Sequence, residues 1–310
     1  MISIVIVNYN SDAYLAAAVA SILRQDHPAN ELIVVDNHST DGSLDALRAS
    51  APTPGLRTRI IDLPRNMGFA HGCNVGIGAA QGSLVLLLNP DCEMRPDALG
   101  KLASALDAHP EAGMAGPRLV NADGSEQRGG RRDIPNPWQI FCYIMQFHRW
   151  MSRHPRFRDF NRLGDPLPEA PVQVQAISGA CMLVRRTAID DIGLMDEERF
   201  FLHFEDLDWC LRFNNAGQRV LFTPDAVVQH AQGVSSAHNL VRAEFHKHRS
   251  LIRFLRKHFA SFYPSTFMFA VAALVAARFC WVALRVALRR RPALALSDLR
   301  SVAAAGKDIR

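Results

Sequence analysis

The stretch that decides the fold is Ile2-Ser3-Ile4-Val5-Ile6-Val7, which is followed at once by the polar triplet Asn8-Tyr9-Asn10. Apart from Ser3, every residue of this stretch is a β-branched apolar residue, so the stretch predicts a strand that is buried on both faces. No charged segment precedes it, and we therefore expect no signal peptide.

Similar apolar runs alternate with helical patterns through the first half of the chain. They predict strands at residues 32–35, 59–61 and 84–88, and helices at about 12–24, 69–80 and 96–109. This alternation predicts an α/β fold with a mostly parallel sheet that helices cover on both faces. Ligands bind such sheets beyond the carboxyl ends of the strands, so polar residues that follow the strands are candidates for a site.

The chain has 310 residues, of which 48% are apolar, and we expect a main domain at residues 1–240. Its first half is residues 1–125, and its second half is residues 172–240. Between them, residues 126–171 form an irregular insertion that is rich in Pro, Arg and aromatic residues and is expected to contain one helix near residues 138–151. Six cysteines without a CxxC pair indicate reduced thiols and a cytosolic protein.

The tail, residues 241–310, carries most of the positive charge. It holds 14 Lys and Arg against 3 Asp and Glu, whereas residues 1–240 hold 21 against 27. A helical segment at about 238–259 is followed by Pro264 and by an apolar helix at 265–288. The aliphatic run in this helix favours an anionic membrane surface, and not nucleic acid, as the partner of the basic tail.

Arginines interrupt the apolar helix. Arg278 and Arg285 are seven residues apart, and with Arg289 they lie near one helical face. This pattern favours a helix that lies in the membrane interface with snorkelling arginines. A transmembrane span and a helix buried against the main domain are the alternatives.

The first two strands end in polar residues that suit a nucleotide. Asn8 and Asn10 follow the first strand, and Asp36 follows the second, where an acid can accept a hydrogen bond from a ribose hydroxyl or a base imino group. Residues 40–43 equally suit a turn that caps the next helix. Because no glycine follows the first strand, the pattern argues against a dinucleotide-binding Rossmann fold.

A third loop, residues 65–76, places a cation and amides at the start of a helix. Arg65 and Asn66 stand where backbone N–H groups point outward, an arrangement that suits an anionic ligand. Gly72 and Gly76 instead predict close packing of one helix face.

The strand at residues 84–88 is followed by Asn89-Pro90-Asp91. A carboxylate at this place suits Mg²⁺ or Mn²⁺ bound to a pyrophosphate, because the cation neutralises charge on a departing diphosphate. A simple Asn-Pro-Asp turn is the alternative. His230 follows another apolar strand and could reach the same cation, although a lone histidine is also a common structural residue.

Three acids stand among aromatic residues at Glu205-Asp206-Leu207-Asp208. Burial beside apolar rings and repulsion between adjacent acids raise carboxylate pKa values, which is one way to make a base that deprotonates a hydroxyl group. Acids that satisfy the free amides of a helix start are the alternative, and this alternative fits Asp208 better than Asp206.

The order of these motifs resembles the family 2 glycosyltransferases of the GT-A fold, and in particular their bacterial rhamnosyltransferase-like branch. The resemblance rests on matching segments in the same order along the chain, namely residues 4–10, 35–43, 66–70, 88–91, 178–186, 205–212 and 246–250. No single segment is decisive, whereas their common order is specific for the family.

The resemblance implies roles for particular residues. Contacts to the donor would come from Asn8, Asn10, Asp36, Arg65, Asn66, Gly68 and Asn89. Asp91 would hold the metal with His230, and Asn89 stands where many relatives have the first acid of an Asp-x-Asp motif. Asp206, with Glu205 beside it, would supply the base. The sugar or acceptor side would be lined by Ser178, Gly179 and Trp209.

The activity implied by the resemblance is an inverting transfer of a sugar from a nucleotide-sugar donor to a glycan or lipid-linked acceptor in cell-surface polysaccharide biosynthesis, with Mg²⁺ or Mn²⁺ as cofactor. Asp206 would take the proton of the acceptor hydroxyl, and the metal at Asp91 would stabilise the leaving diphosphate. Rhamnose from dTDP-rhamnose is the leading donor, with galactofuranose, N-acetylglucosamine and glucose as alternatives. The tail would hold the protein at the inner face of the cell membrane, peripherally or as an anchor.

Two other classes of protein compete with this interpretation. A non-catalytic nucleotide-sugar-binding protein of the same fold would have no need for both Asp91 and Asp206. A nucleotidyltransferase would need a glycine-rich, lysine-bearing loop after the first strand, which this sequence lacks.

Overall fold

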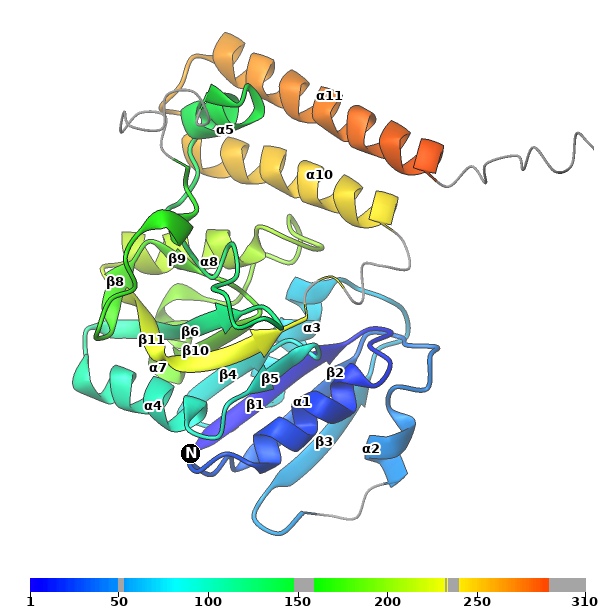
Figure 1. Cartoon of the computed structure of the whole chain (residues 1–310), viewed down its shortest axis with the longest axis vertical. Helices are drawn as coiled ribbons and strands as arrows, with labels where there is room; N and C mark the ends of the chain where they lie inside the picture. Colours follow the sequence, from blue (N-terminus) through cyan, green and yellow to red (C-terminus); the bar gives the residue numbers. More distant parts are fainter. Residues whose placement is uncertain (50–52, 148–158, 232, 234–239, 290–310) are drawn as a thin grey trace, which may run out of the picture.

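A single large sheet with helices on both faces forms the main part of the protein (Figure 1). The computed structural model describes residues 1–49, 53–147, 159–231, 233 and 240–289. Within these residues the sheet has nine strands in the order β3-β2-β1-β4-β10-β6-β11-β5, with β8 paired to β11. The predicted α/β class is therefore confirmed.

The first half of the sheet is parallel. Its strands are β1 (Ile2–Asn8), β2 (Glu31–Asp36), β3 (Arg57–Asp62) and β4 (Leu84–Leu88). These are the four strands that the sequence predicts, and a short helix, α2 (Asp45–Ala49), lies between β2 and β3. The carboxyl ends of β1, β2 and β4 consequently lie at one edge of the sheet, together with the polar residues that follow them.

The second half of the sheet reverses direction at β10 (Cys181–Arg185), which is antiparallel to both β4 and β6 (Ala112–Val120). β11 (Arg219–His230) is parallel to β6 and antiparallel to β5 (Cys92–Met94) and β8 (Val172–Val174). Because Cys181 pairs with Leu88, the residues that precede β10 lie beside the residues that follow β4.

β1 divides the core into two layers, because its side chains alternate between the faces of the sheet. Its isoleucines pack with α1 (Tyr14–Leu23) and α4 (Ala98–Ala108). Its valines pack on the other face with α3 (Phe69–Ala79), α7 (Arg186–Ile192) and α8 (Glu205–Asn215). The strand is thus buried on both faces, as its sequence predicts.

α3 approaches β1 closely at two glycines. A Cβ atom on Gly72 would lie 2.6 Å from Cγ1 of Val7, and a Cβ atom on Gly76 would lie 2.2 Å from Cγ1 of Val5. Both distances are too short for non-bonded carbon atoms, so any larger residue would push the helix away from the sheet. The predicted packing role of these two glycines is confirmed.

The insertion contributes a small second sheet and a helix. β7 (Arg131–Arg132) pairs with β9 (Ala176–Ile177), and α5 (Pro137–Ile144) follows β7, with a short 3₁₀ turn, η2 (Arg162–Gly164), farther on. The sequence predicts a helix to residue 151, whereas α5 ends at Ile144, because Gln146 has a positive φ of 60° that a right-handed helix does not accommodate. Residues 148–158 lie outside the described part of the chain.

The tail begins with two helices, α10 (Leu240–Phe259) and α11 (Ser265–Arg289), which form a hairpin beside α5, shown in yellow and orange in Figure 1. Val271 and Val275 of α11 are buried in the core. Between residues 267 and 288, by contrast, the exposed residues of α11 are all apolar except Arg285. By length and composition α11 could cross a membrane, although one of its faces is packed on the protein.

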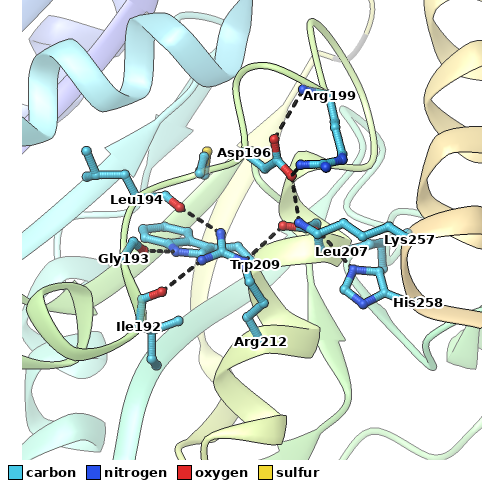
Figure 2. A network of polar contacts seen from close by, with 12 residues as sticks. Ile192, Gly193, Leu194, Asp196, Arg199, Leu207, Trp209, Arg212, Lys257 and His258 are labelled. Atoms are coloured by element: carbon cyan, nitrogen blue, oxygen red, sulfur yellow. Dashed lines mark hydrogen bonds and ion pairs between the residues drawn. The ribbon is translucent and has the colours of Figure 1, made fainter.

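α10 is tied to α8 through a buried acid. The carboxylate of Asp208 accepts hydrogen bonds or ion pairs from His258 Nε2 at 2.7 Å, Lys257 Nζ at 2.6 Å and Arg212 Nε at 3.0 Å. Burial raises the pKa of Asp208, but these hydrogen bonds and charges outweigh it and hold the pKa below its ordinary value. Figure 2 shows Lys257 and His258 reaching this network from α10. Asp208 therefore has a structural role, although its partners are cations and not the free amides expected at a helix start.

Candidate active site

The polar residues after β1 and β2 form one hydrogen-bonded cluster. Asn8 Nδ2 donates to Asp36 Oδ1 at 3.1 Å and to Ser43 Oγ at 2.9 Å. Ser39 donates to Asp36 through its hydroxyl, at 2.6 Å, and through its backbone N–H, at 3.0 Å. Asn8 is fully buried and Asp36 is 6% exposed. The structure therefore places Asn8 between the two loops, where it positions Asp36 and does not face solvent.

Asn10 joins the same two loops nearer the surface. Its N–H donates to Ser39 Oγ at 3.1 Å, and its side-chain Oδ1 accepts from the N–H of Thr40 at 2.8 Å. Asn10 has a positive φ of 46°, a conformation that asparagine adopts more readily than most residues. The two loops thus form one preorganised surface at the carboxyl ends of β1 and β2.

Asn37 connects this surface to the third loop, although no motif singles it out. Its side chain donates to the Gly68 carbonyl at 3.1 Å and accepts from the N–H of Met67 at 2.7 Å. Asn66 accepts from the N–H of Gly68 at 3.0 Å, and Arg65 is exposed at the edge of the loop. The second and third loops are therefore held together by side-chain to backbone hydrogen bonds.

Gly68 fits a place where no other residue would. It has a positive φ of 96°, and a Cβ atom there would lie 2.6 Å from the carbonyl oxygen of Phe201. The same carbonyl accepts from the N–H of Phe69 at 2.8 Å. The third loop is consequently bound to the segment that leads into α8.

The acid after β4 faces a histidine at the end of β11. Asp91 Oδ1 lies 3.3 Å from His230 Nε2, and the two side chains are 9% and 10% exposed. Strand pairing brings them together, because β5, which follows Asp91, is hydrogen-bonded to the last residues of β11. The predicted approach of His230 to Asp91 is therefore observed.

The residues at this place fit a divalent cation. A carboxylate oxygen and an imidazole nitrogen 3.3 Å apart are two acceptors that a cation can bind together. Asn89 adds a buried side-chain oxygen that has no hydrogen-bond partner among the described residues. Orphaned buried acceptors are rare, and one that stands two residues before the carboxylate of Asp91 suits a metal or its bound water.

Cys92 lies within reach of Asp91 and His230, but its chemistry differs. Burial, with the nearby charge of Asp91, raises the pKa of this thiol well above its ordinary value. The thiol therefore stays protonated, and Mg²⁺ and Mn²⁺ prefer oxygen ligands. Among the described residues, Asp91, His230 and Asn89 are thus the better donor set.

The acids of α8 reach the same edge of the sheet through the residues before β10. Gly179 N–H donates to Asp206 Oδ2 at 3.1 Å, and the neighbouring Ala180 carbonyl accepts from the N–H of Asn89 at 2.8 Å. A Cβ atom on Gly179 would lie 3.1 Å from the Asp206 Cβ. Asp206 is thereby connected through two residues to the loop that carries Asp91. Ser178 is the next residue in the same turn.

Asp206 and Glu205 have different surroundings. Asp206 accepts hydrogen bonds from Gly179, from its neighbour Leu207 and from the guanidinium of Arg132, a residue that no sequence motif indicates. Glu205 is 5% exposed, and its Oε2 has no partner among the described residues. Burial, followed by the charge of Asp206, raises the pKa of Glu205 to about 8.

The segment before α8 is strained. His203 and Phe204 have positive φ values of 64° and 71°, a conformation that costs non-glycine residues on the order of 1–3 kcal/mol each. Burial, with the charge of Lys247, lowers the pKa of His203 to about 4, so this imidazole is neutral at physiological pH. Such strain is typical of a site that requires one particular backbone conformation.

Trp209 does not line this site. Its side chain is fully buried, it packs edge-on against Phe213, and its indole N–H donates to the Gly193 carbonyl at 2.9 Å (Figure 2). The expected place of Trp209 on the sugar or acceptor side is therefore wrong, because this aromatic ring serves the core between α7 and α8.

The fold, with polar residues gathered at the carboxyl ends of its strands, is typical of a transferase that acts on a nucleotide-activated donor. The chain belongs to glycosyl transferase family 2, whose family model matches residues 3–193. It is a glycosyltransferase that acts on nucleotide sugars, as the sequence motifs indicate.

Two curated relatives illustrate the similarity. The chain is 27% identical over 281 residues to N-acetylglucosaminyl-diphospho-decaprenol L-rhamnosyltransferase of Mycobacterium tuberculosis, covering 87% of this chain and 83% of the relative. It is 38% identical over 107 residues to the succinoglycan biosynthesis protein ExoO of Rhizobium meliloti, covering 34% of this chain and 30% of the relative.

Solved structures share the fold. The mannosyltransferase PcManGT from Pyrobaculum calidifontis, in complex with GDP-Man and Mn²⁺, has a TM-score of 0.56 and 18% identity, covering 98% of this chain and 79% of that one. GalNAc-T7 with UDP, GalNAc and Mn²⁺ has a TM-score of 0.55 and 18% identity, covering 74% of this chain and 43% of that one. The predicted GT-A fold is confirmed.

Proposed function

We propose that this chain is an inverting, divalent-metal-dependent transferase that moves rhamnose from dTDP-rhamnose to a lipid-linked acceptor at the inner face of the cell membrane, in the synthesis of a cell-surface polysaccharide. One observation carries the mechanistic part of this proposal. The loop after β4, which holds Asp91, is hydrogen-bonded to the turn that holds Asp206 in place. A reacting anomeric carbon between these two acids would have a leaving group on one side and a base on the other.

The reaction is a single in-line displacement. Asp206 takes the proton from the acceptor hydroxyl, the acceptor oxygen forms a bond to the anomeric carbon, and the bond from that carbon to the diphosphate oxygen breaks. The configuration at the anomeric carbon inverts because the acceptor attacks opposite the leaving group. A divalent cation held by Asp91 and His230, with Asn89 nearby, would neutralise the charge of the leaving diphosphate.

The two carboxylate oxygens of Asp206 have different partners. Arg132 and the N–H of Gly179 both bind Oδ2, whereas Oδ1 accepts from the N–H of Leu207. A carboxylate oxygen has two lone pairs, so Oδ1 can accept the acceptor hydroxyl while Arg132 stays in place. Glu205, which is protonated at neutral pH, is then suited to donate a hydrogen bond to a sugar hydroxyl and not to act as the base.

The donor lies on the surface formed by the first three loops. Asp36 accepts from the nucleoside, Asn10 and Asn66 border it, and Arg65 is placed at the exposed edge where a diphosphate passes. Asn8 contributes by holding Asp36, since it has no exposed surface. The choice of rhamnose, and of a lipid diphosphate as acceptor, is supported by the similarity to the mycobacterial rhamnosyltransferase.

The tail holds the enzyme against the membrane with α11 in the plane of the interface. Between residues 267 and 288 its exposed residues are apolar except Arg285, and an apolar face of this kind suits lipid. Arg278 points inward, with its guanidinium 5.8 Å from the ring centre of Tyr143 on α5, so α11 is packed on the protein and does not stand apart as a span. Exposed basic residues of α10, including Arg249 and Arg256, would meet anionic headgroups or a lipid diphosphate.

A donor panel tests this proposal. The purified full chain is incubated with dTDP-, UDP- and GDP-linked sugars and a short-chain GlcNAc-diphospho-lipid, with Mn²⁺, Mg²⁺ or EDTA, and the product is analysed by mass spectrometry and NMR. We expect transfer of rhamnose from dTDP-rhamnose with an inverted anomeric configuration, and no transfer in EDTA. Asp206→Asn should lower turnover by roughly 100-fold or more while donor affinity is retained. The control is Asp97→Asn, which changes a half-exposed acid directly before α4 that is paired with Lys101.

The same panel distinguishes the alternatives. Transfer of another sugar would correct the donor while the catalytic assignment stands. Donor binding in calorimetry without hydrolysis or transfer would favour a non-catalytic binding protein. Full activity of Asp206→Asn would remove the assigned base, and full activity after exhaustive EDTA treatment would remove the metal.

A further inference from the structure

A buried glutamine lies directly behind the histidine of the proposed metal site. Gln127 follows the turn at residues 121–125, is 4% exposed, and is fixed by its N–H, which donates to the Leu119 carbonyl at 2.8 Å. Its side chain meets His230 of β11 twice, once at the backbone and once at the ring. No motif in the sequence points to Gln127.

The hydrogen bonds of Gln127 determine which way its amide points. Its Nε2 lies 3.0 Å from the His230 carbonyl oxygen and 3.1 Å from Asn121 Oδ1. The backbone carbonyl can only accept, so the NH₂ group of Gln127 must face it. The side-chain oxygen then faces His230 Nδ1 at 2.7 Å, and an oxygen at that distance requires a hydrogen on Nδ1.

This hydrogen on Nδ1 determines what the other ring nitrogen can do. Only a neutral imidazole can bind a cation, and in that form one nitrogen carries the hydrogen and the other carries a lone pair. A hydrogen held on Nδ1 therefore leaves the lone pair of the metal-binding form on Nε2, the nitrogen that lies 3.3 Å from Asp91 Oδ1. A histidine whose Nδ1–H is held by a fixed acceptor is the usual form of a metal-binding histidine.

We propose that Gln127 is a positioning residue that holds His230 in the Nδ1–H form and so presents the Nε2 lone pair, beside Asp91, to a divalent cation. This inference rests on the metal site of the proposed function. It adds a residue from the insertion, outside the loops that hold the donor, to the parts of the chain that determine metal affinity.

The test compares substitutions of Gln127 by two measurements that do not depend on turnover. Side-chain ¹⁵N NMR of His230 in the metal-free full chain should show the Nδ1–H form in the wild type and a shift toward the Nε2–H form in Gln127→Met. Mn²⁺ binding, followed by EPR with Mn²⁺ alone, should weaken by about 10- to 100-fold in Gln127→Met, the range found when such supporting hydrogen bonds are removed. Gln127→Glu keeps an acceptor for Nδ1–H and should lie closer to the wild type in both measurements.

A control separates this role from that of holding the turn. Asn121→Ala removes the other side-chain partner of Gln127 and leaves its bonds to His230, so Mn²⁺ affinity should change by less than about threefold. Two results would overturn the inference. One is an Nε2–H form of His230 in the wild type. The other is a Gln127→Met variant that binds Mn²⁺ as tightly as the wild type although His230→Ala has lost Mn²⁺ binding. If neither His230→Ala nor Asp91→Asn changes Mn²⁺ affinity, the metal site itself fails, and the inference fails with it.

Discussion

Glutamine in place of Glu205 is expected to stabilise this enzyme at neutral and alkaline pH. Glu205 is 5% exposed, and burial together with the charge of Asp206 raises its pKa to about 8. The folded chain therefore holds this carboxyl protonated at neutral pH, whereas the unfolded chain ionises it near its ordinary value of 4.5. The folded state binds a proton that the unfolded state releases, so the free energy of unfolding falls as the pH rises from about 4 to about 8.

The size of this effect follows from the two pKa values. At about 1.4 kcal/mol per pH unit, the interval from 4.5 to about 8 costs on the order of 3 kcal/mol at pH 7 and 5 kcal/mol at pH 9. Glutamine does not ionise and avoids this cost. The amide of glutamine would lie where Glu205 Oε2 now lies, and that atom has no hydrogen-bond partner among the described residues. A buried amide group without a partner costs about 1–3 kcal/mol. We expect a net gain of about 1 kcal/mol at pH 7 and about 3 kcal/mol at pH 9.

Urea unfolding followed by circular dichroism at pH 5, 7 and 9 measures this difference. The free energy of unfolding of Glu205→Gln relative to the wild type should rise with each step in pH. Glu198→Gln, a substitution of an exposed acid nearby, is the control and should show no such rise. A difference between Glu205→Gln and the wild type that is the same at pH 5 and at pH 9 would refute the reasoning.

Three further results are expected. Asp208→Asn should lower the free energy of unfolding by about 1–3 kcal/mol in urea, because a fully buried side chain loses the charge with which the partly exposed Lys257 and Arg212 pair. The pKa of Asp208 is lowered in the folded wild type, so the stabilisation that this acid provides is present above about pH 4 and is lost as the pH falls below 4. The difference in free energy of unfolding between the wild type and Asp208→Asn should therefore be smaller at pH 3 than at pH 7. An equal difference at the two pH values would contradict this prediction. Gly68→Ala should weaken donor binding in calorimetry by about tenfold or more, because its Cβ would meet a backbone carbonyl at 2.6 Å; unchanged affinity would show that the third loop can move away. The double substitution Trp281→Glu and Leu284→Glu should reduce binding to vesicles that contain phosphatidylglycerol by about tenfold or more. The control Leu194→Glu, at an exposed site of the main domain, should not reduce it. If the double variant binds the vesicles as well as the wild type does, the lipid contact lies elsewhere.

The parallel half of the fold could be predicted because β1, β2 and β4 are local apolar runs, whereas β3 offers only Ile60 and Ile61. The reversal at β10 could not, because the pairing of Cys181 with Leu88 joins segments about half the main domain apart and no local pattern records it. The same reversal is what brings Gly179 and Asp206 to Asn89. The link between the turn that binds Asp206 and the loop that carries Asp91 is therefore implied by the family resemblance and not by any local pattern of residues.

Side-chain direction explains the remaining differences at the site. Asn8 is the last residue of β1, and its side chain points toward the buried Asp36 and Ser43. A polar side chain at the end of a strand therefore supports the loops here and does not face solvent. Trp209 follows the acids of α8, and sequence spacing does not distinguish a ring in the core from a ring in a site. Gln127 and Asn37 act through their amide groups within ordinary polar turns, and their partners become clear only in the folded chain.

The segment at residues 199–204 relates the tail to catalysis. Its carbonyl groups bind two partners at once, since Phe201 accepts from the N–H of Phe69 in the donor loop, while Leu202 accepts from Ser250 of α10 at 3.0 Å. The strained residues His203 and Phe204 end this segment, directly before α8 and Asp206. α10 therefore holds the segment between the third loop and α8, whereas α11 contacts α10 and α5 and presents its apolar face outward. If the proposed function holds, the two tail helices have different roles: loss of α11 is expected to remove the proposed membrane contact, and loss of α10 is expected to remove the support of the segment before Asp206, the proposed base.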